Sequence, residues 1–203
     1  MALTLFGVTF TESHDVRPDV PATELIVVRD VAAICAQSEY ARLEPTPDAI
    51  ARYTAVVDAY NHRGPMLPAP MGVVFRSRDA VQRWLELHFV ALSDALNYVE
   101  HRVVGRVHVW RPADADEREV DSDPAAAAAE SLRVLRHAAV TSVPLRTEQL
   151  SGIVLSAAFL VEHERWAEFV AEVEVQRQHA PDLKFELTGP WPPYDFVQMQ
   201  LGA

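Results

Sequence analysis

The chain has 203 residues and a formal net charge of −11, from 29 acidic and 18 basic side chains. This negative charge repels a phosphate backbone and an anionic lipid surface, so it provides no electrostatic basis for binding nucleic acid or a lipid membrane. The hydrophobic fraction of 49% is that of a folded globular protein. We predict a cytoplasmic, soluble protein, because the chain has a single cysteine, its N-terminus lacks a signal-peptide pattern, and no apolar run reaches the ~18 residues that span a bilayer.

The first elements predicted along the chain are short. A run of apolar and β-branched residues predicts a first strand, a polar loop follows, and a second apolar run predicts another strand. Asp30 is expected to cap a short helix, and the apolar sequence of that helix would bury Cys35 as an inert thiol. The two strands and the short helix are predicted over residues 3–10, 25–28 and 31–37.

Two amphipathic helices are predicted next. Thr46, Pro47 and Asp48 have the character of an N-cap, a first-turn proline and a first-turn acid. The helix that they open places four large side chains on one face, namely Ile50, Tyr53, Val57 and Tyr60. The second helix starts after a cap at Ser77 or Asp79 and repeats apolar residues at spacings of three and four, at Val81, Trp84, Leu85, Phe89, Leu92, Leu96 and Val99.

A proline-rich connector, residues 64–71, lies between these two helices and leads into a short predicted strand, residues 72–75. It combines stiff prolines with Met66 and Met71, whose side chains adapt to varied apolar partners. It is either a buried connector or, if exposed, a protein-binding loop.

From Val103 onward the predicted order is strand, helix, strand, strand, helix, strand, which is the βαββαβ pattern of ferredoxin-like domains. Asp123 and Pro124 open its first helix, and Pro144 indicates that the second strand lies at a sheet edge. The strands are predicted over residues 103–110, 140–145, 153–161 and 183–187. One helix is predicted over residues 124–138, and a second, marked by Trp166, Phe169, Val170 and Val173, is ended by Pro181-Asp182. We therefore predict an α+β protein with an N-terminal domain (1–102) that includes a long connecting helix, a ferredoxin-like domain (103–188) and a tail (189–203).

No residue pattern in the chain is typical of a catalytic or metal site. The eight histidines form no His-Glu-x-x-His arrangement, and His101, His108 and His163 are expected to be surface or satisfied side chains. The acidic stretch 114–123 lacks the glycine and glutamate of a calcium loop, and no strained turn presents Ser142, Ser151 or Ser156 as a nucleophile. We expect neither metal nor cofactor and no enzymatic activity; the alternative is a small α+β enzyme or ligand-binding domain with a site between its halves.

The C-terminal tail is the least ordinary segment. Three prolines stiffen it, and each pushes the preceding residue toward extended geometry. Trp191, Tyr194 and Phe196 add aromatic contact area at low side-chain entropy cost. The tail is either a strap on the chain's own core or a docking surface for a partner, and the two roles are compatible.

This tail also carries a family resemblance. Residues 188–197, Thr-Gly-Pro-Trp-Pro-Pro-Tyr-Asp-Phe-Val, resemble the C-terminal signature of the gas vesicle GvpL/GvpF family. Residues 5–8, residues 67–75 and residues 92–109 around Glu100 resemble further segments of that family, although Met71 replaces an aromatic residue and the segment after Trp110 is short.

The resemblance implies an accessory or structural protein of gas vesicle assembly, located in the cytoplasm and at the gas vesicle. Its implied partner is the small hydrophobic shell protein, with other gas vesicle accessory proteins as further candidates; a generic homo-oligomeric scaffold is another possibility. The residues that carry the family's two motif blocks are the candidate protein-binding residues: Pro190, Trp191, Pro192, Pro193, Tyr194 and Phe196 in the tail, with Leu67, Pro68, Gly72 and Phe75 in the second block.

Overall fold

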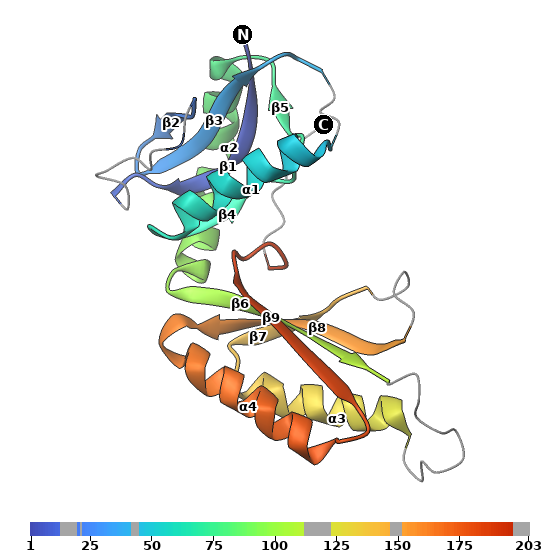
Figure 1. Ribbon diagram of the computed structural model, residues 1–203. Coiled ribbons are helices and arrows are strands. Elements are labelled where there is room, and N and C mark those ends of the chain that lie inside the picture. The colour runs from blue at the N-terminus through green and yellow to red at the C-terminus, as the bar shows by residue number, and fades with distance from the viewer. Residues whose placement is uncertain (13–19, 21, 42–44, 112–122, 147–151, 197–203) are drawn as a thin grey trace. The chain divides into compact units, whose positions relative to one another are not determined.

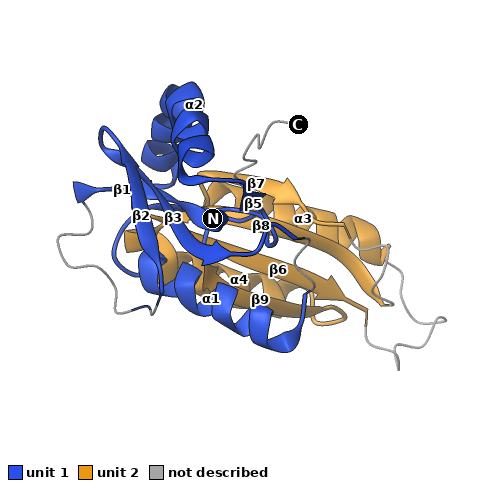
Figure 2. Cartoon of the chain, turned by 90° about the horizontal axis from the view of Figure 1, so that it is seen from above, with its two compact units in different colours: residues 1–101, 192–203 blue, residues 102–191 orange. Residues whose placement is uncertain are grey.

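The chain folds into two compact units, each with its own antiparallel sheet (Figures 1 and 2). The computed structural model describes all residues except 13–19, 21, 42–44, 112–122, 147–151 and 197–203. Unit 1 comprises residues 1–101 and 192–203, and unit 2 comprises residues 102–191. Strands and helices in both units confirm the predicted α+β class. The chain passes between the units after His101 and again after Trp191, so the tail is divided between them.

The sheet of unit 1 is built around its first strand. β1 (Ala2–Phe10) pairs along its length with β3 (Val31–Ser38), and β2 (Glu24–Val28) pairs with the other side of β3. Two short strands, β4 (Met66–Pro68) and β5 (Val74–Phe75), pair with the remaining side of β1. Helices α1 (Pro47–Asn61) and α2 (Arg78–Val99) cover opposite faces of this sheet, so β1 and β3 are buried almost throughout (Figure 1).

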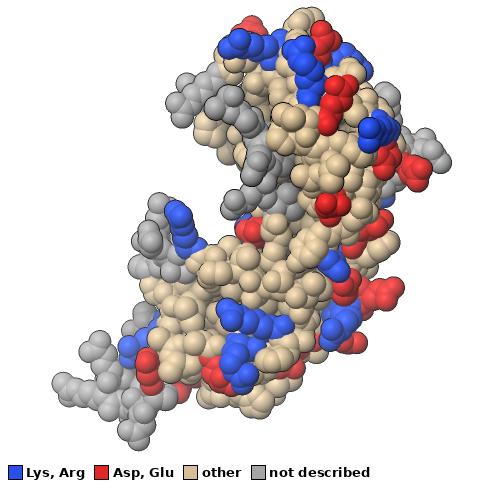
Figure 3. Space-filling model, turned by 180° about the vertical axis from the view of Figure 1, so that it is seen from behind, with Lys and Arg blue, Asp and Glu red and all other residues tan. Residues whose placement is uncertain are grey.

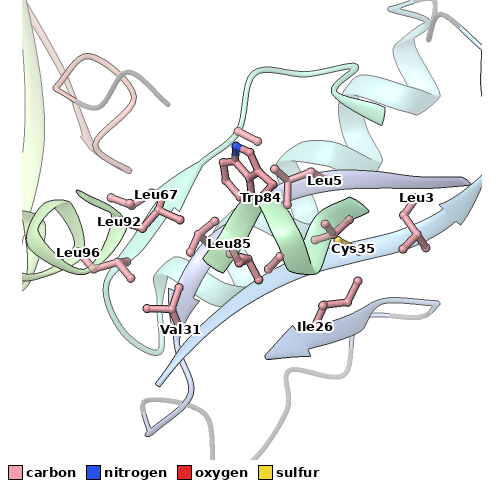
Figure 4. Close-up of a cluster of buried hydrophobic side chains, with 14 of the residues drawn as sticks. Leu3, Leu5, Ile26, Val31, Cys35, Leu67, Trp84, Leu85, Leu92 and Leu96 are labelled. Carbon is pink, nitrogen blue, oxygen red and sulfur yellow. The ribbon is translucent and has the colours of Figure 1, made fainter. Parts of the chain in front are cut away.

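Both helices of unit 1 begin at the predicted caps. In α1 (Pro47–Asn61) the Thr46 hydroxyl oxygen accepts a hydrogen bond from the Ala49 amide at 3.3 Å. In α2 (Arg78–Val99) the cap is Ser77 rather than Asp79, because the Ser77 hydroxyl accepts from the Ala80 amide at 3.2 Å. Trp84 and Leu85 of α2 point toward the sheet, where they join the larger core cluster (Figure 4).

The predicted short helix over residues 31–37 is wrong, since these residues form β3. Arg29 and Asp30 make the two-residue turn that joins β2 to β3, with Arg29 at a φ of +56°, so Asp30 caps no helix. Residues 31–35 are all fully buried between the two helices. A strand buried on both faces shows no alternation in its sequence, and periodicity alone cannot tell it from a buried helix.

Unit 2 contains the element order predicted from Val103 onward. Its elements are β6 (Arg102–Trp110), α3 (Pro124–His137), β7 (Thr141–Pro144), β8 (Ile153–Glu162), α4 (Trp166–His179) and β9 (Lys184–Trp191). The sheet order is β7-β8-β6-β9, with all neighbours antiparallel, so β7 with its Pro144 is an edge strand as predicted. α3 and α4 pack on one face of this sheet over Val107, Phe159 and Phe185.

β9 continues beyond its predicted end at Leu187. It incorporates residues 188–191 and pairs Trp191 with Val104 across a shift in register. Because β9 is an edge strand, Pro190 can occupy it without removing a required ladder hydrogen bond. The start of the tail is therefore part of a sheet.

Candidate protein-binding site

The two motif blocks meet in unit 1 at Tyr53 of α1. The Tyr53 hydroxyl donates a hydrogen bond to the backbone carbonyl of Ala69 at 2.5 Å, which lies in the second block. The same hydroxyl shares a hydrogen bond with the side chain of Tyr194 in the tail. The Tyr53 ring stacks on Phe6 of β1 with 6.2 Å between ring centroids. Three segments distant in sequence are thus joined through one side chain.

Burial is the main cause of a strongly raised pKa at Tyr53, and the negative charge and hydrogen bond of Tyr194 raise it further. The Tyr53 phenol is therefore neutral throughout the physiological range. It acts in this site as a structural hydrogen-bonding group and not as a base.

The tail residues differ in exposure. Trp191 is 41% exposed at the end of β9, and its indole nitrogen donates to the Thr188 hydroxyl at 3.0 Å. Pro192 and Pro193 are buried in unit 1. Tyr194 is half-buried against the cluster that contains Phe6, and Phe196 is also half-buried. Within the tail, exposed aromatic surface is greatest at Trp191.

The second motif block is largely internal to unit 1. Leu67 and Pro68 are buried in β4, where Pro68 pairs with Gly7 of β1. Gly72 adopts a φ of +92°, a backbone conformation that favours glycine. Phe75 is half-buried, with its ring 5.6 Å from that of Trp84. Gly72 and Phe75 are thus the members of this block that reach the surface.

A pocket of about 290 Å³ lies beside Tyr53 within unit 1. It opens between the first half of α1 and the face of the sheet that α1 covers. Phe6, Tyr53 and Met71 provide apolar walls, and Asp48 and Arg52 lie on its α1 side. Gly72 of the second motif block also lines it, so the pocket adjoins the place where the two blocks meet.

Sequence reasoning missed one polar pair in unit 2. Ser156 Oγ lies 2.6 Å from Nδ1 of His108 in a hydrogen bond between β8 and β6. The strand register places Glu186 of β9 opposite His108 on its other side. Ser156 is only 4% exposed, which leaves a substrate little access to its hydroxyl. Alternation along both strands was the signal available in the sequence, but the register that aligns them is not local.

The other candidate polar residues that the structure describes form no comparable site. His101 lies 3.9 Å from Glu100, and His163 is exposed in a 3-10 turn before α4. Among the residues that the structure describes, no group of three or more His, Cys, Asp or Glu side chains is arranged to hold a metal. Ser151 and residues 114–122 of the acidic stretch lie outside the described residues.

On the face that Figure 3 shows, charged side chains are interspersed with uncharged surface. Several of the charges are paired along helices, as between Arg133 and Glu130 and between Arg165 and Glu168. Within the described part of the chain, no helix is both long and apolar enough to cross a membrane.

Comparisons with known proteins all point to one family. The family model described as gas vesicle synthesis protein GvpL/GvpF matches residues 5–133 and 114–198. Gas vesicle protein F2 of Halobacterium salinarum is 26% identical over 180 residues, covering 86% of this chain and 80% of that protein. Gas vesicle protein L of a Streptomyces species is 30% identical over 186 residues, covering 74% of this chain and 69% of that protein.

Two solved structures have a similar fold. The crystal structure of GvpF from Anabaena superimposes with a TM-score of 0.79 at 14% identity, covering 98% of this chain and 96% of that one. The crystal structure of GvpF from Microcystis aeruginosa gives a TM-score of 0.71 at 13% identity, covering 98% of this chain and 99% of that one.

Proposed function

Because the chain belongs to the GvpL/GvpF family of gas vesicle proteins, we propose that it is a non-catalytic accessory protein of gas vesicle assembly that binds the hydrophobic shell protein. It acts in the cytoplasm and at the growing vesicle, where other accessory proteins are further partners. The observation that carries this proposal is the exposed Trp191 within the family's C-terminal motif. Large aromatic side chains that remain exposed are the typical anchors of protein interfaces.

The physical demand on such a protein explains its surface. A shell subunit apolar enough to line a gas space aggregates in water, so a binding protein must offer apolar area and keep itself dispersed. A net charge of −11 spread around limited apolar surface meets both requirements.

Exposure divides the motif residues into two proposed roles. Pro190, Trp191 and Phe196, with Gly72 and Phe75 of the second block, offer surface to the partner. The buried residues support them by fixing the backbone of the two blocks, and these are Leu67, Pro68, Pro192 and Pro193. Tyr194 does both, since part of its ring is exposed and its side chain is bonded to Tyr53.

Co-expression with the shell protein tests this proposal. We expect Trp191→Ala to lower capture of the shell protein without unfolding the chain, and Trp191→Ala combined with Tyr194→Ala to lower it further. The matched control is Leu87→Ala, which removes an apolar side chain that is 79% exposed on α2, outside both motif blocks. Full capture by a folded Trp191→Ala and Tyr194→Ala double variant would exclude the tail as the docking surface.

A further inference from the structure

The pocket beside Tyr53 has the dimensions of a site for one side chain. Its volume of about 290 Å³ falls just below the ~300–1,000 Å³ typical of small-molecule sites. An extended dinucleotide or a similarly large cofactor does not fit in this space. One aromatic or branched aliphatic side chain fits, and Phe6, Tyr53 and Met71 would bury it.

The mouth of the pocket carries one charge of each sign. Asp48 and Arg52 lie four residues apart on α1 and hence on the same face of the helix. Both side chains are exposed, and neither forms an ion pair with any residue that the structure describes. Their charges are available to groups on either side of an inserted apolar side chain.

Hydroxyl and amide groups line the sheet side of the pocket. Thr4, Gln37 and Ser38 come from the ends of β1 and β3. The Ser38 hydroxyl oxygen is buried and has no hydrogen-bond partner among the described residues. This oxygen is shielded from solvent, so Gln37, which is exposed, is a polar side chain on this side of the pocket that a bound segment can reach.

The same core already accepts an aromatic side chain from a proline-rich turn, in which the Tyr194 amide donates to the Pro192 carbonyl at 2.8 Å. Tyr194 packs against the cluster that contains Phe6 and Tyr53, yet it is not among the residues that line the pocket. Tyr53 thus has the chain's own tail as one neighbour and the pocket as another. This precedent favours a polypeptide segment over a small metabolite as the occupant.

We propose that this pocket binds an aromatic or branched aliphatic side chain from a segment of the gas vesicle shell protein, with the charged neighbours of that side chain paired to Asp48 and Arg52. The inference rests on the proposed function, because it takes the partner from there. It adds a second contact, on α1, to the contact at Trp191.

The test uses the full chain and two probes. The first is N-acetyl-phenylalaninamide, titrated while backbone amide shifts are recorded by NMR. We expect shift changes centred on Gln37, Ser38, Ala49 and Gly72, which line the pocket. The second probe is a set of overlapping peptides that cover the shell protein, and the peptides that bind should perturb the same amides.

The variants fill the pocket or change its charge. Ala49→Phe places a ring in the pocket from α1, and Ala51→Phe is the matched control because residue 51 is an exposed position of the same helix. We expect Ala49→Phe to weaken binding of both probes about tenfold, equivalent to about 1.4 kcal/mol, and Ala51→Phe to leave binding unchanged. Arg52→Glu, at an exposed site that does not threaten folding, should weaken binding of peptides with an acidic residue beside the apolar one.

The outcomes separate this inference from the proposed function. Normal capture of the shell protein by a folded Ala49→Phe variant would overturn the pocket inference and leave the proposed function standing. Shift changes that map elsewhere, or binding unaffected by both Ala49→Phe and Arg52→Glu, would overturn it as well. No capture of the shell protein by the wild-type chain would overturn the proposed function, and the pocket inference with it.

Discussion

The Tyr53 hydroxyl donates to the carbonyl of Ala69 at 2.5 Å, and through this bond a helix side chain holds the backbone of the second motif block. Ala69 is held from a second direction, because its amide donates to the Phe6 carbonyl at 2.9 Å. The phenol is also bonded to Tyr194, so the position of the tail depends on the same side chain. Both motif blocks therefore contact the hydroxyl of Tyr53, and we expect them to be coupled energetically through it.

Removing these hydroxyls tests the coupling. We expect Tyr53→Phe to lower the free energy of unfolding by about 1–3 kcal/mol, because a largely buried carbonyl loses its donor and Tyr194 loses its partner. Tyr194→Phe should lower the free energy of unfolding by less than Tyr53→Phe does, because Tyr53 keeps its hydrogen bond to Ala69. Urea denaturation of both single variants and the double variant gives the interaction energy, which we expect to be at least about 0.5 kcal/mol.

Tyr40→Phe is the control for this cycle, because Tyr40 is 60% exposed and lies outside the motif blocks. Tyr40→Phe should lower the free energy of unfolding by no more than about 0.5 kcal/mol. Strict additivity of Tyr53→Phe and Tyr194→Phe would show that the two blocks are not coupled through these hydroxyls.

Elements with local signals could be predicted from the sequence. Thr46 with Pro47, and Asp123 with Pro124, cap and open helices at the predicted residues, because a cap bonds to amides only two or three residues away. The strand at 31–38 could not be predicted from local signals, because its conformation follows from pairing with β1 and β2 and from burial on both faces. Alanine-rich sequence in isolation favours helix, and here tertiary pairing overrides that preference.

The site was less accessible to sequence reasoning than the fold. Periodicity placed Tyr53 on the apolar face of α1, where it packs against the core, although Ile50 of the same predicted face is 46% exposed. The bonds of Tyr53 to Ala69 and Tyr194 depend on how distant segments fold together. The pocket has the same origin, since it is lined by β1, β3, α1 and the connector before β5. The motif residues were visible in the sequence, whereas the division into exposed Trp191 and buried Pro192 and Pro193 was not.

Cys35 should make stability fall at alkaline pH. Burial, followed by the negative charge of Glu24, raises the pKa of this thiol to about 12, while Arg78 lowers it slightly. In the unfolded chain the thiol ionises near pH 8.5, so above that pH only the unfolded state releases the proton and gains stability. We expect this group alone to remove about 2 kcal/mol between pH 7 and pH 10, measured by urea denaturation.

Cys35→Ala is the control for the alkaline loss. It should lower stability at all pH values through lost packing, yet flatten the dependence on pH between 7 and 10. A thiol reagent should modify wild-type Cys35 only at the rate of unfolding, because the side chain is fully buried. Rapid modification of the native chain at pH 8 would contradict the buried, neutral thiol.

Gly7 should tolerate no side chain, because a Cβ there would lie 2.6 Å from the Leu67 carbonyl oxygen and would also clash with Met66 Cε. The carbonyl belongs to backbone that pairs with β1, so relief of the clash requires β4 to move away. We expect Gly7→Ala to lower the free energy of unfolding by about 2–4 kcal/mol and to reduce the protection of β4 amides from hydrogen exchange.

Gly105→Ala is the matched comparison, because it is also a glycine in a central strand. Its Cβ would meet only side chains, of Trp166, Phe169 and Leu187, at 3.0 to 3.2 Å. These side chains can shift by a few tenths of an ångström, so we expect a smaller loss of about 1 kcal/mol. Equal losses for the two substitutions would show that backbone contact at Gly7 is not the deciding factor.

The hydrogen bond between Ser156 and His108 should contribute to stability and not to catalysis. Ser156→Ala leaves His108 Nδ1 without its partner, and we expect a loss of about 1 kcal/mol in the free energy of unfolding. Ser142→Ala, at a half-buried position of the neighbouring β7, should lower the free energy of unfolding by less than about 0.5 kcal/mol.

A serine nucleophile must be reachable by its substrate, and Ser156 is 4% exposed. We therefore expect a fluorophosphonate probe to leave the native chain unlabelled in mass spectrometry, whereas covalent attachment at Ser156 would indicate a hydrolytic site built from Ser156, His108 and Glu186.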